Sequence, residues 1–149
     1  EELLLNDTSI KKLPTSFSNL SSLKKLAVWK KLTTIDIDFP ASLQEIDFRT
    51  NKLSEIPENL LSLPNLQHLD ISDNPFTEMP FIKNNALKTL KIDRTPFGIF
   101  KSNILKTKQF YANCEIEDPV KYADDKTLYL SATKKYYSSS HPNGHHSSH

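Results

Sequence analysis

Histidine, cysteine and carboxylate side chains are the groups in this chain that could carry catalysis or bind a metal. His68 stands two places before Asp70, and four other histidines lie in the carboxy-terminal stretch HPNGHHSSH. The sequence has no glycine-rich phosphate loop, no paired C-x-x-C and no H-E-x-x-H pattern. A nucleophile needs a base within hydrogen-bond reach, and a metal needs ligands held by a scaffold. We therefore expect no catalytic residue, no metal site and no cofactor.

His68 and Cys114 each have two interpretations. His68 is expected beside Asp47 and Asp70 across neighbouring strands, either as a pH-sensitive contact or as an ordinary surface histidine, and the second is simpler. Cys114 is either a small buried residue, which we favour, or a reactive thiol. A single cysteine excludes an internal disulfide and leaves the compartment open. We expect the cytoplasm or delivery into a host cell rather than a disulfide-rich extracellular setting.

The amino-acid composition limits the classes of partner that the chain is expected to bind. The 149 residues carry 19 basic and 18 acidic side chains, a formal net charge of +1. This balance gives no general attraction to nucleic acid, and no apolar run approaches the ~20 residues of a membrane span. We expect neither nucleic-acid binding nor membrane insertion. The chain does not start with Met and is expected to be a fragment or a processed chain.

A repeated frame must position any functional side chain. Residues 43–57 read LQEIDFRTNKLSEIP and residues 66–80 read LQHLDISDNPFTEMP. Both are apolar at the first, fourth and sixth places and have Asn at the ninth. We call the fourth place of each copy its anchor. The anchors along the chain are Leu3, Leu26, Ile46, Leu69, Leu90, Lys108 and Leu128. Alternation around each anchor predicts a short strand, and stacked copies bury their apolar residues together.

Asn or Thr recurs five places after the anchors, where each strand should turn. A carboxamide or hydroxyl there can bond backbone groups that the turn leaves unpaired. The second copy has Lys31 at this position, so we expect a local distortion there. We call this column the ladder, and its members are Thr8, Asn51, Asn74, Thr95, Asn113 and Thr133.

The frame resembles the leucine-rich repeat, L-x-x-L-x-L-x-x-N-x-L, over nearly all of residues 1–133. The resemblance implies an α/β solenoid, a horseshoe of about seven coils with a parallel sheet on its concave face. Its convex side would be irregular or extended. Residues 134–149 are expected to be a disordered His/Ser-rich tail or a cloning remnant.

The positions between the frame residues vary and should form the partner-binding concave face. Trp29 is singled out because Trp, Tyr and Arg dominate interface hot spots, although burial under a missing amino-terminal cap would explain it equally well. The charged positions are either a solvated face or determinants of specificity. The expected contact residues are Trp29, Asp47, Arg49, Asp70, Ser72, Asp93, Arg94 and Tyr111.

The resemblance implies a non-catalytic module that binds a protein partner. The short coil FPASLQEIDFRTNKLSEIP resembles those of bacterial virulence effectors, some of which add a ubiquitin-ligase domain, so this chain is alternatively the substrate-recognition portion of such an effector. The catalytic C-x-D motif of those domains is absent, since the local sequence CEIED has Ile116 in place of Asp. The 23-residue coils with LPTSFSNLSSL equally resemble intracellular repeat proteins of eukaryotes and of other bacteria. A third alternative is a structural or self-assembling unit. We expect a monomer or weak self-association through the solenoid ends.

Overall fold

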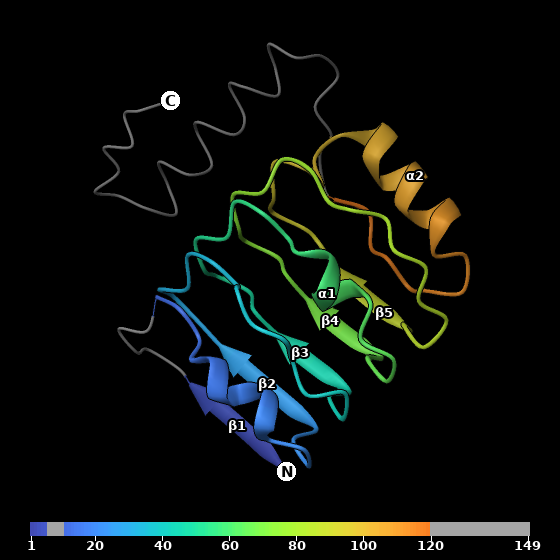
Figure 1. The fold of residues 1–149 in the computed structure, drawn as a ribbon. Coiled ribbons are helices and arrows are strands. Elements are labelled where there is room, and N and C mark those ends of the chain that lie inside the picture. The colour runs from blue at the N-terminus through green and yellow to red at the C-terminus, as the bar shows by residue number, and fades with distance from the viewer. Residues whose placement is uncertain (6–10, 120–149) are drawn as a thin grey trace.

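Five short parallel strands organise the molecule. The computed structural model describes residues 1–5 and 11–119. Within them the sheet order is β1-β2-β3-β4-β5, so each strand lies beside its sequence neighbour and the chain winds forward by one strand per coil (Figure 1). The strands are β1 (Glu2–Leu5), β2 (Lys25–Val28), β3 (Glu45–Asp47), β4 (His68–Asp70) and β5 (Thr89–Lys91). The predicted repeat solenoid with a parallel sheet is confirmed for this part of the chain.

The register of the sheet follows the first five anchors. Leu3 pairs with Leu26, Leu26 with Ile46, Ile46 with Leu69, and Leu69 with Leu90. An anchor and the residue two places later point into the core, as the burial of Ile46 and its successor Phe48 shows. The alternation in sequence therefore becomes one buried and one open face of the sheet.

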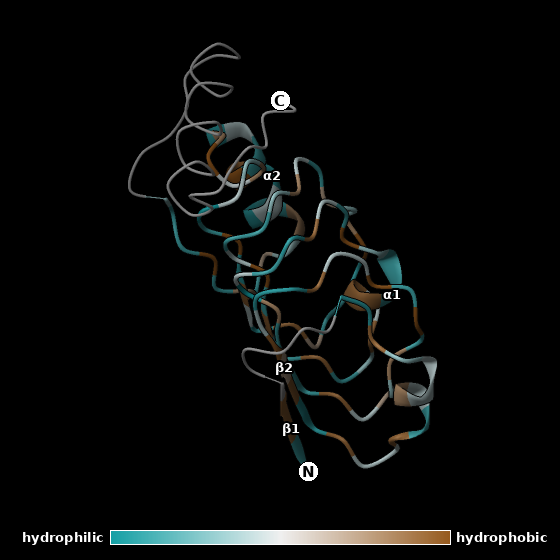
Figure 2. Cartoon of the chain, turned by 90° about the vertical axis from the view of Figure 1, so that its left-hand side faces the viewer, coloured by the Kyte–Doolittle hydropathy of each residue, from teal (hydrophilic) through white to brown (hydrophobic). Residues whose placement is uncertain are grey.

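The segments that return from one strand to the next close the core. They contain a 3-10 helix (Thr15–Asn19), the short helix α1 (Glu58–Leu61) and otherwise irregular chain. Figure 2 shows brown apolar positions recurring in the strands and in the returning segments of successive coils. The third coil illustrates this with four buried residues, Leu53, Ile56, Leu60 and Leu63.

Asn51 and Asn74 join successive coils. The Asn74 side chain accepts a hydrogen bond from Leu53 N at 3.0 Å and donates to Phe48 O at 2.9 Å, both in the preceding coil. It also donates to Ile71 O at 3.1 Å in its own coil. Asn51 repeats the pattern one coil earlier. Each carboxamide therefore closes its own turn and holds the turn before it.

The residue before each ladder position has a left-handed backbone. The φ angles are 58° at Thr50, 54° at Asp73 and 52° at Arg94, whereas Lys30 departs further at 90°. A non-glycine residue costs about 1–2 kcal/mol in this conformation. Hydrogen bonds to the next coil help to offset that cost, as from Thr50 N to Ser72 O at 3.1 Å. The larger angle of Lys30 lies in the second coil, where Lys31 at the ladder position is exposed.

A second set of polar side chains, not predicted from the sequence, links the returning segments. Ser42 Oγ donates to Leu23 O at 2.6 Å, and Asn65 Nδ2 donates to Ala41 O at 2.8 Å. Both donors stand one place before the first apolar residue of the frame. Their spacing was visible, but Ser and Asn are also ordinary turn residues and so did not stand out.

The predicted sixth anchor, Lys108, is wrong. Residues 101–110 form the helix α2 (Lys101–Phe110) instead of a strand. The position beside β5 is taken by Glu115, which forms a bridge with Thr89 and accepts a hydrogen bond from Leu90 N at 3.0 Å. Ile116 follows as a buried residue, in the place of an anchor.

The error has a physical reason. Ile104, Thr107 and Tyr111 are buried at a spacing of three and four residues, which is the period of a helix face. Asn113 consequently lies in the exposed turn after α2 and is not a ladder residue, which corrects that prediction. Thr8, Thr133 and the seventh anchor Leu128 lie outside the described residues, as does the predicted tail at 134–149.

Asn74→Ala should lower the free energy of unfolding by about 1–3 kcal/mol, because it leaves buried backbone groups of two coils without partners. Asn85→Ala, at an exposed site, is the matched control and should change stability by less than about 0.5 kcal/mol. Urea denaturation measures both. Equal stability of the two variants would contradict the proposed role of Asn74.

Thr50→Gly should leave the free energy of unfolding unchanged or raise it by up to about 1 kcal/mol, because glycine accepts the left-handed backbone without strain. Lys52→Gly is the control, since Lys52 is exposed and has no positive φ. It should lose about 0.5–1 kcal/mol through the entropy of the unfolded chain. If both glycine variants lose the same stability in urea denaturation, the turn is not strained at Thr50.

Candidate functional site

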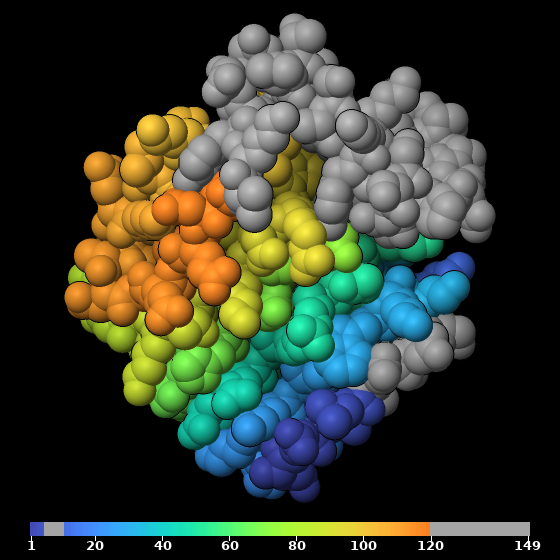
Figure 3. All heavy atoms as spheres, turned by 180° about the vertical axis from the view of Figure 1, so that it is seen from behind, coloured from blue at the N-terminus to red at the C-terminus, as the bar shows by residue number. Residues whose placement is uncertain are grey.

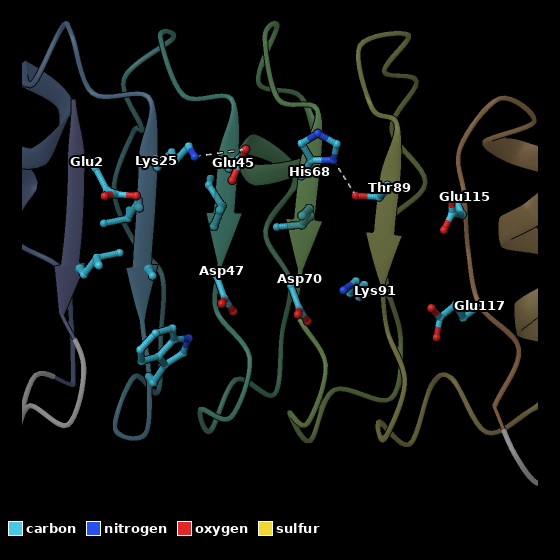
Figure 4. Close-up of a pocket in the computed structure, with 16 residues that line it drawn as sticks. Glu2, Lys25, Glu45, Asp47, His68, Asp70, Thr89, Lys91, Glu115 and Glu117 are labelled. Atoms are coloured by element: carbon cyan, nitrogen blue, oxygen red, sulfur yellow. Dashed lines mark hydrogen bonds and ion pairs between the residues drawn. The ribbon is translucent and has the colours of Figure 1, made fainter.

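The open face of the sheet forms a hollow that we call the trough. It is lined by the side chains immediately before and after the anchors of β1 to β5, by Trp29 just after β2, and by Glu115 and Glu117 beside β5. Figure 4 shows these side chains rising from neighbouring strands to the same side. Figure 3 views the molecule from the side opposite to Figure 1, and the coils cross it as parallel bands in sequence order. None of the lining residues comes from α1, α2 or the 3-10 helix.

Asp47 and Asp70 occupy the middle of the trough. They are direct partners on β3 and β4, one place after their anchors. Asp47 Oδ1 accepts a hydrogen bond from Arg49 N at 3.1 Å, and Asp70 Oδ1 accepts one from Ser72 N at 3.0 Å. Each carboxylate thus caps the end of its own strand and is held in a fixed orientation.

The pKa of Asp70 is raised above its ordinary value. Burial is the main cause, because it disfavours the charged form, and the neighbouring Asp47 adds to the effect. Hydrogen bonds from Ser72 and the charge of Lys91 act in the opposite direction. The trough therefore holds two carboxylates side by side, one of which is costly to ionise.

Trp29 follows β2 and Arg49 follows β3, just past the carboxyl ends of these strands. The Arg49 guanidinium carbon is 5.2 Å from the centre of the Trp29 ring, a cation–π arrangement. Trp29 is half-buried, and its Nε1 is buried without a hydrogen-bond partner in the described structure. Of the aliphatic side chains that line the trough on β1 and β2, Leu4 is 57% exposed whereas Ala27 is buried. The exposed apolar surface at this end of the trough is therefore small.

A family model of the leucine-rich repeat matches residues 65–85. This segment contains β4, the ladder residue Asn74 and the turn at Asp73, and the same register extends from β1 to β5. The chain contains a leucine-rich repeat. Leucine-rich repeats generally serve as protein-interaction modules and are typically not catalytic. Among the described residues, no helix combines the length and apolar character that crossing a bilayer requires.

The leucine-rich repeats place the predicted contact residues at different depths. Asp47, Asp70 and Trp29 line the trough, and Arg49 covers the ring of Trp29. Ser72 is almost fully buried, and its hydroxyl donates to Asp93 Oδ1 at 2.6 Å, so it supports Asp93 rather than presenting itself to a partner.

Asp93 and Arg94 stand beyond the trough lining, just past the end of β5. Arg94 Nε lies 3.4 Å from Asp93 Oδ2, so the two neighbours form an ion pair. Both side chains are partly solvent-exposed, and an exposed pair contributes at most about 1 kcal/mol. Neither charge is needed inside the repeat core, which leaves both accessible at the rim.

Tyr111 does not lie on the open face, which corrects the prediction. Its side chain is buried at the end of α2, and its hydroxyl donates to Ile82 O at 2.8 Å. Burial raises the pKa of Tyr111, whereas its hydrogen bond to Ile82 acts in the opposite direction. The misplacement follows from the wrong sixth anchor, since the strand expected at residues 107–110 is a helix.

His68 and Cys114 show no arrangement for catalysis. His68 Nδ1 lies 2.8 Å from Thr89 Oγ1, so one ring nitrogen is engaged by the neighbouring strand. Cys114 is half-buried, and burial, followed by the charge of Glu115, raises the pKa of its thiol to about 11. The thiol is therefore protonated at neutral pH and a poor nucleophile. Within residues 1–5 and 11–119, no group of three or more His, Cys, Asp or Glu could hold a metal ion.

Asp70→Asn should raise the melting temperature at pH 7. The pKa of Asp70 is higher in the folded than in the unfolded chain, so the folded state binds more protons between the two values. Stability from this carboxyl is hence present at low pH and falls as pH rises through that window. Asparagine removes the loss and keeps the Oδ1 acceptor for Ser72 N.

Thermal melts at pH 7 and at about pH 3 measure the effect. The advantage of Asp70→Asn over the wild type should disappear at the lower pH, where Asp70 is protonated in both states. Asp38→Asn, at an exposed site outside the trough, should change the melting temperature little. A destabilised Asp70→Asn at pH 7 would contradict the burial cost assigned to Asp70.

Proposed function

We propose that this chain is a non-catalytic module that binds a protein partner through the trough. The observation that carries the proposal is the arrangement of the face itself. Its side chains project from a rigid sheet, they are not needed for the core on the other side, and they differ in chemistry from strand to strand. A fixed scaffold with variable surface side chains suits recognition because little order has to be gained on binding.

The contact surface combines charged and aromatic groups. Arg49 and Trp29 form one end, Asp47 and Asp70 the middle, and the Asp93–Arg94 ion pair the rim beyond. Arginine and tryptophan at the centre of an interface supply large contact energies, whereas exposed charges at the rim govern specificity and association rate.

The variant Arg49→Ala/Asp93→Ala should lose a protein that the wild type captures from an extract of the source cells. Glu55→Ala/Glu78→Ala is the matched control, because both glutamates are exposed in the returning segments and belong neither to the trough nor to the contact surface around it at Arg49, Asp93 and Arg94. The proposal is tested by quantitative comparison of the proteins that the wild type and the two variants capture. A captured set that is identical for all three proteins would overturn the proposal.

The variant Trp29→Ala distinguishes a role of Trp29 in contacting the partner from a role in stabilising the fold. If Trp29 contacts the partner, capture should fall while the free energy of unfolding changes by clearly less than the ~3–5 kcal/mol typical of a core Trp. A loss of that full size would assign Trp29 to the core and remove it from the contact surface. Urea denaturation and the same capture assay measure the two effects.

In a longer gene product the trough would have a different role. If a catalytic domain is encoded after residue 149, the trough is proposed to select the substrate of that domain, as in a ubiquitin-ligase effector. Self-association through the solenoid ends is the remaining alternative, and light scattering over a range of concentrations tests it.

A further inference from the structure

We propose that the trough binds a basic segment of its partner, in which an arginine or lysine and an apolar residue stand about four positions apart. The inference rests on the proposed function and specifies the chemistry that the same face selects. Three features carry it: the charge of the lining, the opposed pair Asp47 and Asp70, and the apolar end at β1.

The lining is acidic although the whole chain is not. Only two lysines, Lys25 and Lys91, line the trough, against six carboxylates. The chain as a whole has a formal net charge of +1. A hollow of one charge sign concentrates the field and attracts groups of opposite sign. The six acidic residues are Glu2, Glu45, Asp47, Asp70, Glu115 and Glu117.

Ion pairs within the chain neutralise these carboxylates unevenly. Lys25 Nζ lies 3.7 Å from Glu45 Oε1, and Arg49 Nε lies 3.3 Å from Asp47 Oδ2. No ion pair involves Asp70 in the described part of the chain, although Lys91 on the next strand lowers its pKa. The deficit of positive charge is therefore greatest from Asp70 towards Glu115 and Glu117.

Asp47 and Asp70 are opposed on neighbouring strands, where like charges destabilise a sheet. The cost persists because each carboxylate is fixed by a backbone N–H of its own strand. A guanidinium or ammonium group placed above the pair would offset the repulsion with charge-assisted hydrogen bonds. An acidic partner, or the phosphates of a nucleic acid, would increase it.

The column of residues that follow the anchors also sets the spacing along the partner. It begins with the exposed Leu4 on β1, continues through Ala27 and reaches Asp47 and Asp70. Neighbouring strands are about 4.8 Å apart, so Leu4 and Asp70 are separated by roughly 14 Å across the sheet. An extended chain covers this distance with about four residues. An apolar side chain on Leu4 would thus put a basic side chain four positions away over Asp70.

Selection from a library of random twelve-residue peptides against the full chain tests the inference. Peptides recovered at physiological salt should be enriched in arginine and lysine over the input library, and their affinity should fall as salt is raised. Asp47→Asn/Asp70→Asn should weaken the best synthetic peptide at least about tenfold. Asparagine keeps both Oδ1 acceptors, and a thermal melt verifies that the double variant is folded.

Asp36→Asn/Asp38→Asn is the matched control, because both aspartates are exposed and outside the trough, and it should bind as the wild type does. Recovered peptides without basic enrichment, no recovered peptide, or equal binding to Asp47→Asn/Asp70→Asn would overturn the basic-segment inference. If such non-basic peptides still lose binding in Arg49→Ala/Asp93→Ala, the face binds protein and only its charge preference is wrong. Binding indifferent to every trough variant would overturn the proposed function as well.

Discussion

The backbone groups at the turn after each strand impose the constraint on which the coils depend. The chain must reverse within a few residues, and it does so through a left-handed residue at Lys30, Thr50, Asp73 and Arg94. Such a turn leaves buried N–H and C=O groups that need partners. Asn51 and Asn74 supply them from the next coil, so the turns at Lys30 and Thr50 each depend on the coil stacked after them. The same side-chain hydrogen bonds thus satisfy the strained turns and join neighbouring coils.

Because of this constraint, the side chains on the open face of the sheet are not needed to stabilise the fold. Stability comes from the turns and from the apolar residues between strand and returning segment, such as Phe48 and Leu60. The side chains of the trough contribute little to either, so they can carry charges that a core would not tolerate. The opposed Asp47 and Asp70 are the clearest case, since their repulsion is a modest cost against a large buried core.

The sequence predicted the first five coils because several independent signals coincide in each. In the fourth coil, Leu66, Leu69, Ile71 and Asn74 all fit one frame, so an error in one leaves the register intact. The sixth coil lacked this redundancy, and a helix period over Ile104 to Tyr111 prevailed. The sequence predicted which face of the sheet carries the candidate site, but not how deeply each side chain is buried. A position in the frame tells which side Ser72 is on, but not that Asp93 and the neighbouring strands would bury it.

The same rigidity decides what kind of recognition the trough can perform. Asp70 Oδ1 is committed to Ser72 N, and Asp47 is held by both the backbone and the side chain of Arg49. These carboxylates cannot turn far to meet a ligand, so a partner must bring its charge to them. Such a site loses little side-chain entropy on binding but discriminates strictly by spacing. The side chains of a partner must therefore match the spacing of adjacent strands, which is about 4.8 Å.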